Sequence, residues 1–316
     1  MAGINAQAIK ELRERTQAGM SDCKGALVEA EGDMEKAVEI ILKKGLAKSA
    51  KRAGAAATEG EVRAAISADK RRATIVEVNV QTDFAARNDA FKQFVGDVLG
   101  VAEQAPDGAD IGQLQLGGKP IAEVATELTA RIGEKIVARR WDRVEIPEGK
   151  HGIAHAYVHL GGKIGVLLAV ETDTAEVAAH PEVVKFVDDT AMQIAAMSPV
   201  ALRREDIGDD AKAKQKEIFE AQLREDPKPK PEAAWPKIID GKFNKWFSEA
   251  VLLEQESVEA ASRGLSGLTI EKQRDAAAKA AGGAVTVTRF VRFERGEGIA
   301  KKEDDFASEV AKMAST

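Results

Sequence analysis

The apolar positions of residues 1–45 recur at helical spacing in three short series. Each series follows a residue that can cap a helix. Asn5 precedes the first series, Ser21 or Asp22 the second, and Asp33 the third. The spacing therefore predicts three short helices.

Gly45 stops the last of these series, and the alanine-rich residues 46–60 are typical of a linker. The pattern predicts a compact unit in which the three helices share one core. Its inward side chains are expected to be Ile9, Leu12, Cys23, Leu27, Val28, Met34, Ala37, Val38, Ile41 and Leu42.

The next part of the chain alternates apolar and polar side chains, as strands do. Residues 61–67 and 72–80 form one such pair, and residues 153–160 and 163–170 form a second pair around a Gly-Gly turn. An amphipathic helix follows each pair. The order indicates a duplicated core, although the residue types show no visible repeat.

Capping residues mark where the helices of this core begin. Asn88 precedes one helix, Pro120 can open another, and Pro181 a third. Two further strands are expected at about 136–144 and 285–293. The apolar residues expected to face the core are Val76, Val78, Val80, Phe91, Phe94, Val95, Val98, Leu99, Ile121, Val124, Leu128, Ile132, Val184, Val187, Ala191 and Ile194.

Residues 209–262 are more charged than the rest, and prolines interrupt their helical pattern. Such a break predicts a helical hairpin with a rigid corner. An isolated hairpin would leave its large apolar side chains in water, so we expect them to meet the core or another chain. The prolines are Pro227, Pro229, Pro231 and Pro236, and the apolar residues include Ile218, Phe219, Leu223, Phe243, Trp246, Phe247 and Leu252.

The elements together predict an α+β fold with four parts. Residues 1–54 form a small three-helix module. Residues 55–208, completed by 263–296, form a mixed core with two similar halves. Residues 209–262 form the inserted hairpin, and residues 297–316 form a short C-terminal helical module.

The composition narrows the class of protein. The chain has 316 residues, with 44% hydrophobic and 31% charged, enough for two or more domains. We expect no membrane contact and a cytoplasmic location, because no apolar run reaches about 20 residues and no secretory signal is visible. The single cysteine, Cys23, fits a reducing compartment and a buried helix position. A net charge of -6 and 4% aromatic residues argue against nucleic-acid binding.

Motifs for bond chemistry are absent from the sequence. Residues 161–164 read Gly-Gly-Lys-Ile, without the hydroxyl of a phosphate-binding loop, and residues 264–268 lack the second glycine of a nucleophile elbow. His151, His155 and His159 share a strand face, but neighbours there lie about 13 Å apart, too far to share a metal ion. We therefore expect no enzyme activity, no cofactor and no metal.

The run from Glu77 to Arg87 places an acid and a large aromatic side by side where a strand meets a helix. On residue type alone, Phe84 would lie in the core and Asp83 would be a turn or capping acid. An aromatic at a tip held by two elements is also suited to enter a pocket of a partner. The residues alone leave both interpretations open.

Two strings give this chain a family resemblance. The run around Thr82-Asp83-Phe84 and the block Leu12–Lys24 resemble signatures of the elongation factor Ts family, the guanine-nucleotide exchange factors of elongation factor Tu. Ala85 stands where the family usually has valine. Residues 132–136 and 292–299 are weaker matches in the expected order. The resemblance covers nearly the whole chain and loosens only in the inserted hairpin.

The resemblance implies that the chain promotes release of GDP from elongation factor Tu. It implies that Asp83 and Phe84 push between helices of the GTPase beside its magnesium site. It also implies self-association through the hairpin. The three-helix module, by its small size, resembles a ubiquitin-associated-type fold. The residues that it assigns to the partner contact are Thr82, Asp83, Phe84, Arg13, Met20, Lys24, Ile132 and His159.

Two other functions stay open from the residues. The chain could be an adaptor in which Asp83 and Phe84 only pack, or a nucleotide-binding enzyme, which the missing phosphate loop disfavours. Met20 could equally close the core of the helical module. Ile132 has the spacing of a helix core residue.

Overall fold

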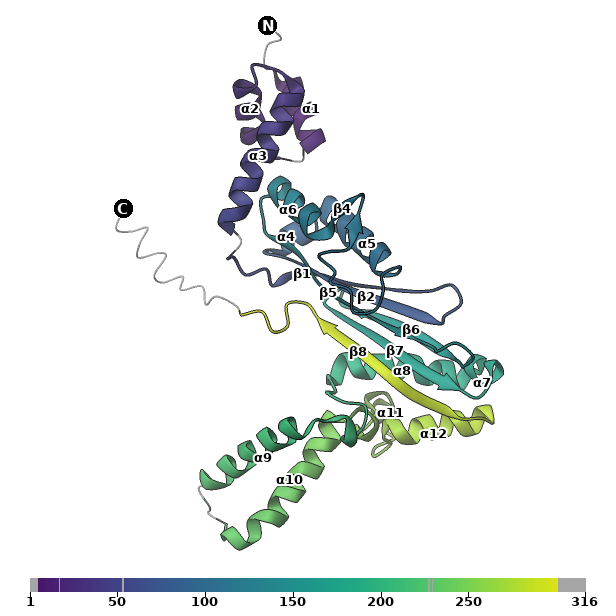
Figure 1. Ribbon diagram of the computed structural model, residues 1–316. Coiled ribbons are helices and arrows are strands. Elements are labelled where there is room, and N and C mark those ends of the chain that lie inside the picture. Colours follow the sequence, from purple (N-terminus) through teal and green to yellow (C-terminus); the bar gives the residue numbers. More distant parts are fainter. Residues whose placement is uncertain (1–4, 17, 53, 227, 229, 301–316) are drawn as a thin grey trace.

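The computed structural model describes residues 5–16, 18–52, 54–226, 228 and 230–300 (Figure 1). A helical module stands at the N-terminus, a core of sheets and helices follows, and a helical hairpin projects from the core. The mixture of helices and antiparallel sheets confirms the predicted α+β class. Of the predicted C-terminal helical module, residues 301–316 lie outside the described residues.

The N-terminal module has the three predicted helices. Asn5 accepts a hydrogen bond from the Ala8 N–H (2.8 Å), and Asp33 accepts one from the Lys36 N–H (3.1 Å), so both predicted caps are confirmed. Cys23 is buried in the shared core, as expected. The helices are α1 (Ala6–Thr16), α2 (Met20–Glu29) and α3 (Met34–Arg52).

Three local predictions about this module are wrong. Helix α2 begins at Met20 with Gly19 at its N-cap, so neither Ser21 nor Asp22 caps it. Val28 is exposed, because the buried face of α2 runs through residues 23, 26 and 27. Helix α3 continues past Gly45 to Arg52, because a single glycine lowers helix stability by only about 1 kcal/mol and need not end a helix.

The first half of the core is a sheet of order β1-β2-β5, with helices on one face. Val76, Val78 and Val80 of β2 share that face and pack against Phe91 and Phe94, as their spacing predicts. The elements are β1 (Glu59–Ile66), β2 (Arg72–Val80), α4 (Asp83–Ala86), α5 (Asp89–Ala102), β3 (Gln115–Leu116), β4 (Lys119–Pro120), α6 (Ile121–Ile132) and β5 (Ile136–Glu145).

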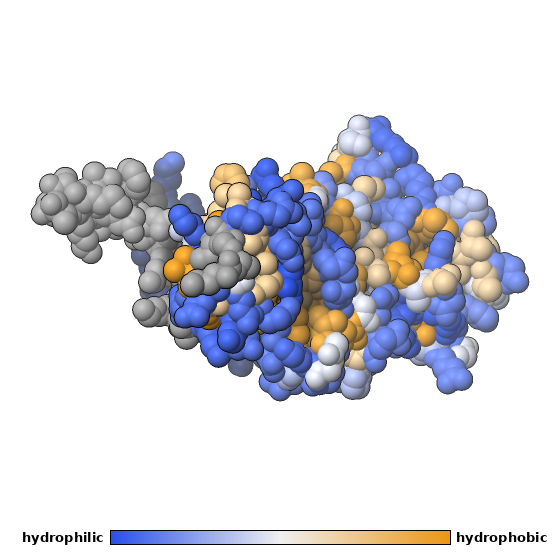
Figure 2. Space-filling view, turned by 90° about the horizontal axis from the view of Figure 1, so that it is seen from above, coloured by the Kyte–Doolittle hydropathy of each residue, from blue (hydrophilic) through white to orange (hydrophobic). Residues whose placement is uncertain are grey.

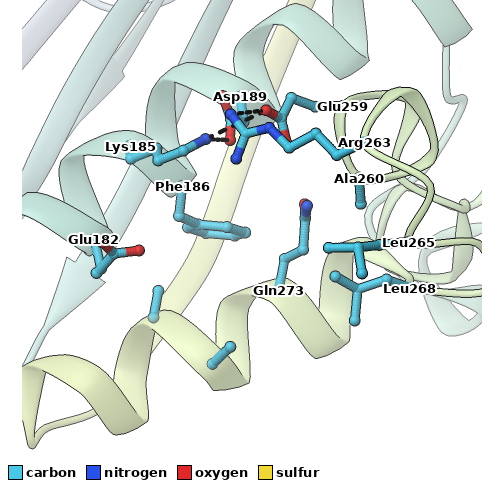
Figure 3. A pocket seen from close by; sticks show the side chains of 12 residues that line it. Glu182, Lys185, Phe186, Asp189, Glu259, Ala260, Arg263, Leu265, Leu268 and Gln273 are labelled. Atoms are coloured by element: carbon cyan, nitrogen blue, oxygen red, sulfur yellow. Dashed lines mark hydrogen bonds and ion pairs between the residues drawn. The ribbon is translucent and has the colours of Figure 1, made fainter.

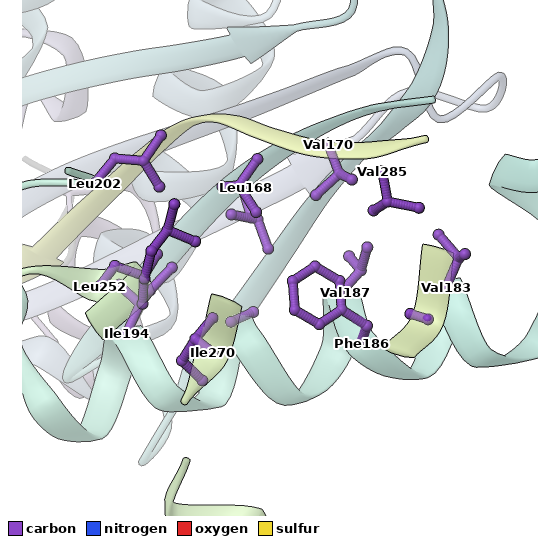
Figure 4. Packing of buried hydrophobic residues seen from close by; sticks show 14 of the residues in the cluster. Leu168, Val170, Val183, Phe186, Val187, Ile194, Leu202, Leu252, Ile270 and Val285 are labelled. Carbon is purple, nitrogen blue, oxygen red and sulfur yellow. The ribbon is translucent and has the colours of Figure 1, made fainter. Parts of the chain in front are cut away.

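The second half is a sheet of order β6-β7-β8, covered by α8 and α12. Figure 4 shows its core, where Val183 and Phe186 point inward from α8. The neighbouring Val184 is exposed, so its predicted core position is wrong by one residue. The elements are β6 (His151–His159), β7 (Ile164–Thr172), α7 (Ala175–Ala179), α8 (Pro181–Met197), η1 (Arg204–Asp206), η3 (Leu252–Glu254), α11 (Val258–Ser262), α12 (Ile270–Ala281) and β8 (Val285–Glu294).

The two halves correspond residue by residue through their first two strands and the helices that follow. The same sequence separation relates β1 to β6, β2 to β7, and Thr82 to Thr174, which cap α4 and α7. It also relates Gly60 to Gly152. At each glycine a Cβ would collide with a backbone carbonyl of the next strand, at 2.1 and 2.2 Å. The duplication therefore lies in backbone positions that residue types conceal.

The two sheets pack face to face. In β2 and β7, alternate residues point to the helices and to the opposite sheet, so the core has layers in the order helix, sheet, sheet, helix (Figure 1). The residues between the sheets are Val62, Ala73, Ile75, Val144, Ile146, Ala154, Leu167, Ala169, Val291 and Phe293.

The hairpin consists of α9 (Asp209–Arg224), η2 (Glu232–Ala234) and α10 (Trp235–Ala250). Phe219 and Leu223 are buried between its arms, and the Phe219 and Phe243 rings meet edge to face with centroids 5.2 Å apart. For these side chains the expectation of contact with the core or another chain is wrong, because the arms cover each other. For Trp246 and Phe247 it is confirmed, because they pack against a cluster of Ala201, Ile207 and Val251 at the base of the hairpin. Residues 251–262 leave the hairpin and pack with the core through Leu252.

A buried carboxylate joins the two halves. Glu77 of β2 is fully buried, and it accepts hydrogen bonds from Arg139 (3.0 and 3.2 Å), Arg140 (2.5 Å) and Asn79 (3.0 Å). It also accepts one from the Gly296 N–H (2.8 Å), just after β8. Burial alone would raise the pKa of this carboxyl, but the bonds from Gly296, Asn79 and Arg140 outweigh burial and lower the pKa below its ordinary 4.5.

We predict that Glu77→Gln lowers the free energy of unfolding by roughly 3 kcal/mol at pH 7, because two arginines lose their buried partner. The wild-type contribution is complete above pH about 4.5 and is lost as pH falls through the lowered folded-state pKa. The variant should therefore lose less stability in acid than the wild type. Urea unfolding at several pH values measures both effects. Glu148→Gln, at an exposed position, is the control. Equal unfolding midpoints for Glu77→Gln and wild type would contradict the prediction.

Candidate functional site

The corner between β2 and α5, residues 81–86, is held at both ends. The Thr82 hydroxyl caps α4 by accepting a hydrogen bond from the Ala85 N–H (3.2 Å). The Glu134 carboxylate accepts from both the Thr82 N–H (2.9 Å) and the Thr82 hydroxyl (2.8 Å). Lys135 donates its N–H to the Gln81 side chain (2.9 Å). These bonds tie the corner to the turn between α6 and β5.

Phe84 projects from this fixed corner with 79% of its surface exposed. The interpretation of Phe84 as a core residue is therefore wrong. Asp83 lies beside it and pairs with Arg87, one turn later, at 2.8 Å. Ala85 points the other way and is buried in the first half, so the replacement of the family's usual valine affects internal packing and not the exposed surface.

The predicted site residues of the N-terminal module are all exposed. Met20 is 59% exposed, so it does not close the module's core. Met20, Lys24 and Val28 follow one another at intervals of four residues and share one face of α2. Arg13 is exposed on α1. Val28 belongs to this face, although its spacing predicted an inward position.

The module is attached to the core close to the corner. The Arg131 side chain, near the end of α6, donates to the Thr16 carbonyl (3.2 Å) at the end of α1. Ile132 follows it and is half-buried against the core of the first half. The structure therefore brings Thr82, Asp83, Phe84 and Ile132 together at one junction. Arg13, Met20 and Lys24 lie on the module beside it.

His159 lies in the second half, at the end of β6. Its Nδ1 is 2.8 Å from the Tyr157 hydroxyl, and the two rings stack with centroids 5.8 Å apart. Both side chains line a groove of about 520 Å³ together with the exposed apolar residues Leu160, Met192 and Val258. The next turn reaches the first half, because the Gly162 carbonyl accepts from the Val62 N–H of β1 (2.8 Å).

The exposed side chains predicted to bind a partner lie in separate, small areas of the surface. Seen from the end that carries the N-terminal module, the surface is largely hydrophilic, with hydrophobic residues gathered in several limited areas (Figure 2). Separate apolar side chains on a polar surface are suited to a partner that binds through several small contacts. None of the described helices combines the length and the apolar character that a membrane crossing requires.

A second pocket, between α8, α11 and α12, has a charged rim (Figure 3). Lys185 pairs with Asp189 and, at 3.6 Å, with Glu259, which also pairs with Arg263. Hydrogen bonding to Asp189 is the main reason that the pKa of Lys185 lies above its ordinary value. A catalytic lysine needs a lowered pKa, so Lys185 is unsuited to base or nucleophile chemistry.

Metal ligation finds no support among the described residues, where no group of three His, Cys, Asp or Glu side chains could hold an ion. His155 contacts Asp188 at 3.3 Å. Burial is the main reason that the pKa of His155 lies below its ordinary value, so it is a neutral histidine near neutral pH.

Comparison with known proteins decides the family. The family model described as "Elongation factor TS" matches residues 81–297, from the corner to the segment after β8. The chain is 43% identical over 313 residues to "Elongation factor Ts" of Clostridium perfringens, covering 98% of this chain and 99% of the relative. The chain belongs to the elongation factor Ts family.

Other members of the elongation factor Ts family match over their full length. The protein from Nitratiruptor sp. is 45% identical over 314 residues, covering 98% of each chain. That from Nautilia profundicola is 43% identical over 318 residues, covering 100% of each. Family membership identifies the chain as an elongation factor of protein synthesis.

One residue that holds the corner of residues 81–86 in this elongation factor was not predicted from the sequence. Glu134 appears there only inside a weak family match, yet its carboxylate holds Thr82. No local signal could show this bond, because the two residues lie on different elements. The only sequence clue is Ala85, which occupies the position from which a capping-box acid would reach back to Thr82.

Proposed function

We propose that the chain is the guanine-nucleotide exchange factor of elongation factor Tu. The observation that carries the proposal is the exposure of Phe84 on a corner that hydrogen bonds hold in place. A large apolar ring kept in water costs free energy, which burial in a partner recovers. Family membership supplies the partner.

In the proposed mechanism, Asp83 and Phe84 enter between helices of the GTPase beside its magnesium site. Disturbing the magnesium ligands and the phosphate-binding region weakens the binding of GDP. The coupling is reciprocal, so GDP weakens the binding of this factor by the same ratio. The chain changes a binding equilibrium, makes and breaks no bond, and binds no nucleotide itself.

The energetics require more contacts than Phe84. A thousandfold weakening of GDP corresponds to about 4 kcal/mol, whereas burying one phenylalanine supplies at most about 3 kcal/mol. Met20, Lys24 and Arg13 on the N-terminal module, and His159 on the second half, are the proposed additional contacts. Their binding energy keeps the Phe84 ring in its site.

Self-association through the hairpin is a separate proposal that rests on the family resemblance. The large rings pack inside the hairpin or against the residues at its base, and among the described residues of α9 and α10 the exposed large apolar side chain is Ile218, 44% exposed on α9. One such contact is small, so a stable dimer would need more of the outer face of the hairpin.

Phe84→Ala is predicted to slow the maximal GDP release from elongation factor Tu at least tenfold, because about 1.4 kcal/mol of contact energy corresponds to one decade. The stability of the chain itself should change by less than about 0.5 kcal/mol, since the ring is 79% exposed. Stopped-flow release of fluorescent GDP and thermal unfolding measure the two. As a contrast, the buried Phe94→Ala should cost roughly 3–5 kcal/mol of stability. A folded Phe84→Ala variant that releases GDP at the wild-type rate would contradict the proposal.

Met20→Ala and Lys24→Ala are each predicted to raise the concentration of factor needed for half-maximal release, by roughly tenfold and threefold, with little change in the maximal rate. The side chains add binding energy away from the corner, and exposed charges contribute less than buried apolar groups. Lys36→Ala, exposed on α3, is the control. A titration in which both variants match the wild type would remove the module from the interface.

Ile218→Glu is predicted to shift any dimer of the chain toward monomer in sedimentation experiments, because it places a charge in an apolar contact. Ala213→Glu, at an exposed position on another face of the same helix, is the matched control. A wild-type chain that sediments as a monomer at high concentration would rule out self-association.

A further inference from the structure

The second half of the core has a corner equivalent to the one that carries Phe84, so the two corners can be compared. In the first half, the Thr82 hydroxyl accepts from the Ala85 N–H at 3.2 Å. In the second half, the Thr174 hydroxyl accepts from the Val177 N–H at 3.3 Å. Both threonines follow the central strand of their sheet and begin a short helix. The two corners therefore share one backbone design.

The contact between each corner and the last strand of its sheet is shared as well. The Gln81 side chain accepts from the Lys135 N–H (2.9 Å), where the chain enters β5. The Asp173 side chain accepts from the Ala284 N–H (2.6 Å), where the chain enters β8. In both halves a left-handed glycine ends the preceding helix, at Gly133 and Gly282. The turns can therefore be compared position by position.

The comparison isolates one difference. After its left-handed glycine, the first half has Glu134, whose carboxylate accepts from the Thr82 N–H and hydroxyl at 2.8 to 3.0 Å. The second half has Gly283 at that position. A Cβ on Gly283 would approach the Val177 side chain to 2.6 Å, so a glutamate there would clash. With this packing, the corner of the second half therefore cannot be held by a carboxylate as the first corner is.

The half that carries this extra acid is also the half that carries Asp83 and Phe84. The equivalent positions of the second corner hold Ala175 and Glu176. Helix α4 spans only four residues, Asp83–Ala86, and a single turn is unstable without outside contacts. The Phe84 ring is 79% exposed, so internal packing contributes little to its direction. Its direction therefore depends on the bonds that hold the start of α4.

We propose that Glu134 is the positioning residue of this corner: its carboxylate, supplied from another element, holds Thr82 so that α4 presents Phe84 in one direction to a protein partner. In a capping box this role belongs to the third residue of the helix, which here is the buried Ala85. The proposal rests on the proposed exchange function. It assigns Glu134 to the step of GDP release and not to general binding.

The same turn also holds the N-terminal module. Arg131 donates to the Thr16 carbonyl (3.2 Å), and the Lys135 ammonium donates to the Ala55 carbonyl (3.1 Å). Residues 131–135 therefore bond both to the module and to the corner, and so fix the two relative to each other. A partner that contacts both surfaces meets them at a fixed separation, which lowers the ordering cost of binding.

The test compares matched substitutions in the two corners. Thr82→Val and Thr174→Val each remove one helix cap with little change in shape, and Glu134→Ala removes the carboxylate. We expect Glu134→Ala and Thr82→Val to lower the maximal GDP-release rate roughly fivefold, the effect on an equilibrium of losing one cap. The half-saturating concentration should change less than twofold. Thr174→Val should release GDP at the wild-type rate, and Glu134→Gln, which keeps one oxygen, should recover part of the loss.

Two further measurements separate positioning from stability. In a Phe84→Ala background, Glu134→Ala should cause no additional slowing, because it acts through that ring. In the free chain, Glu134→Ala should speed hydrogen exchange at the Ala86 amide, which bonds to the Thr82 carbonyl (3.1 Å). Additive losses, equal losses for Thr174→Val, or unchanged amide exchange would each overturn the role of Glu134. A wild-type chain that fails to accelerate GDP release would instead overturn the proposed function, and this inference with it.

Discussion

The arrangement of the whole core depends on the buried Glu77 carboxylate. A buried charge is unfavourable unless donors surround it, and Glu77 has donors from β2, β5 and the segment after β8. Only the Gly296 N–H comes from the second half, so the full set of bonds to Glu77 forms only when the two halves are stacked as they are here. The apolar residues between the sheets favour stacking of any register. The carboxylate selects one.

The stacked halves start from one design and differ where function lies. Both have a threonine-capped short helix after the central strand, and both glycines at positions 60 and 152 allow the same close strand approach. Only the first half adds an exposed aromatic and an acid from a neighbouring turn. The scaffold is therefore repeated, while the residues proposed to enter the partner sit at one corner, as expected when rigid elements carry functional loops.

The free energy that an exchange factor must supply accounts for the several separate residues proposed to contact the partner. One aromatic cannot supply the free energy that opposes a tightly bound nucleotide, so several small contacts must act on one rigid frame. The turn at residues 131–135 provides such a frame by bonding to the corner and to the N-terminal module. Sites that were separately flexible would each lose entropy on binding.

Most of the local elements, and the family, could be predicted from the pattern of residues along the chain. Side-chain periodicity and caps depend on neighbours within a few residues, and so the strands around Val76 and the cap at Asn88 could be predicted from the chain. The tertiary structure alone decided which helix face is covered, so Val28 is exposed, Val184 lies outside, and the hairpin covers its own rings. It also decided the bonds of Glu77 and Glu134, because each joins residues brought together only by packing of distant elements. Local pattern carries no information about such partners.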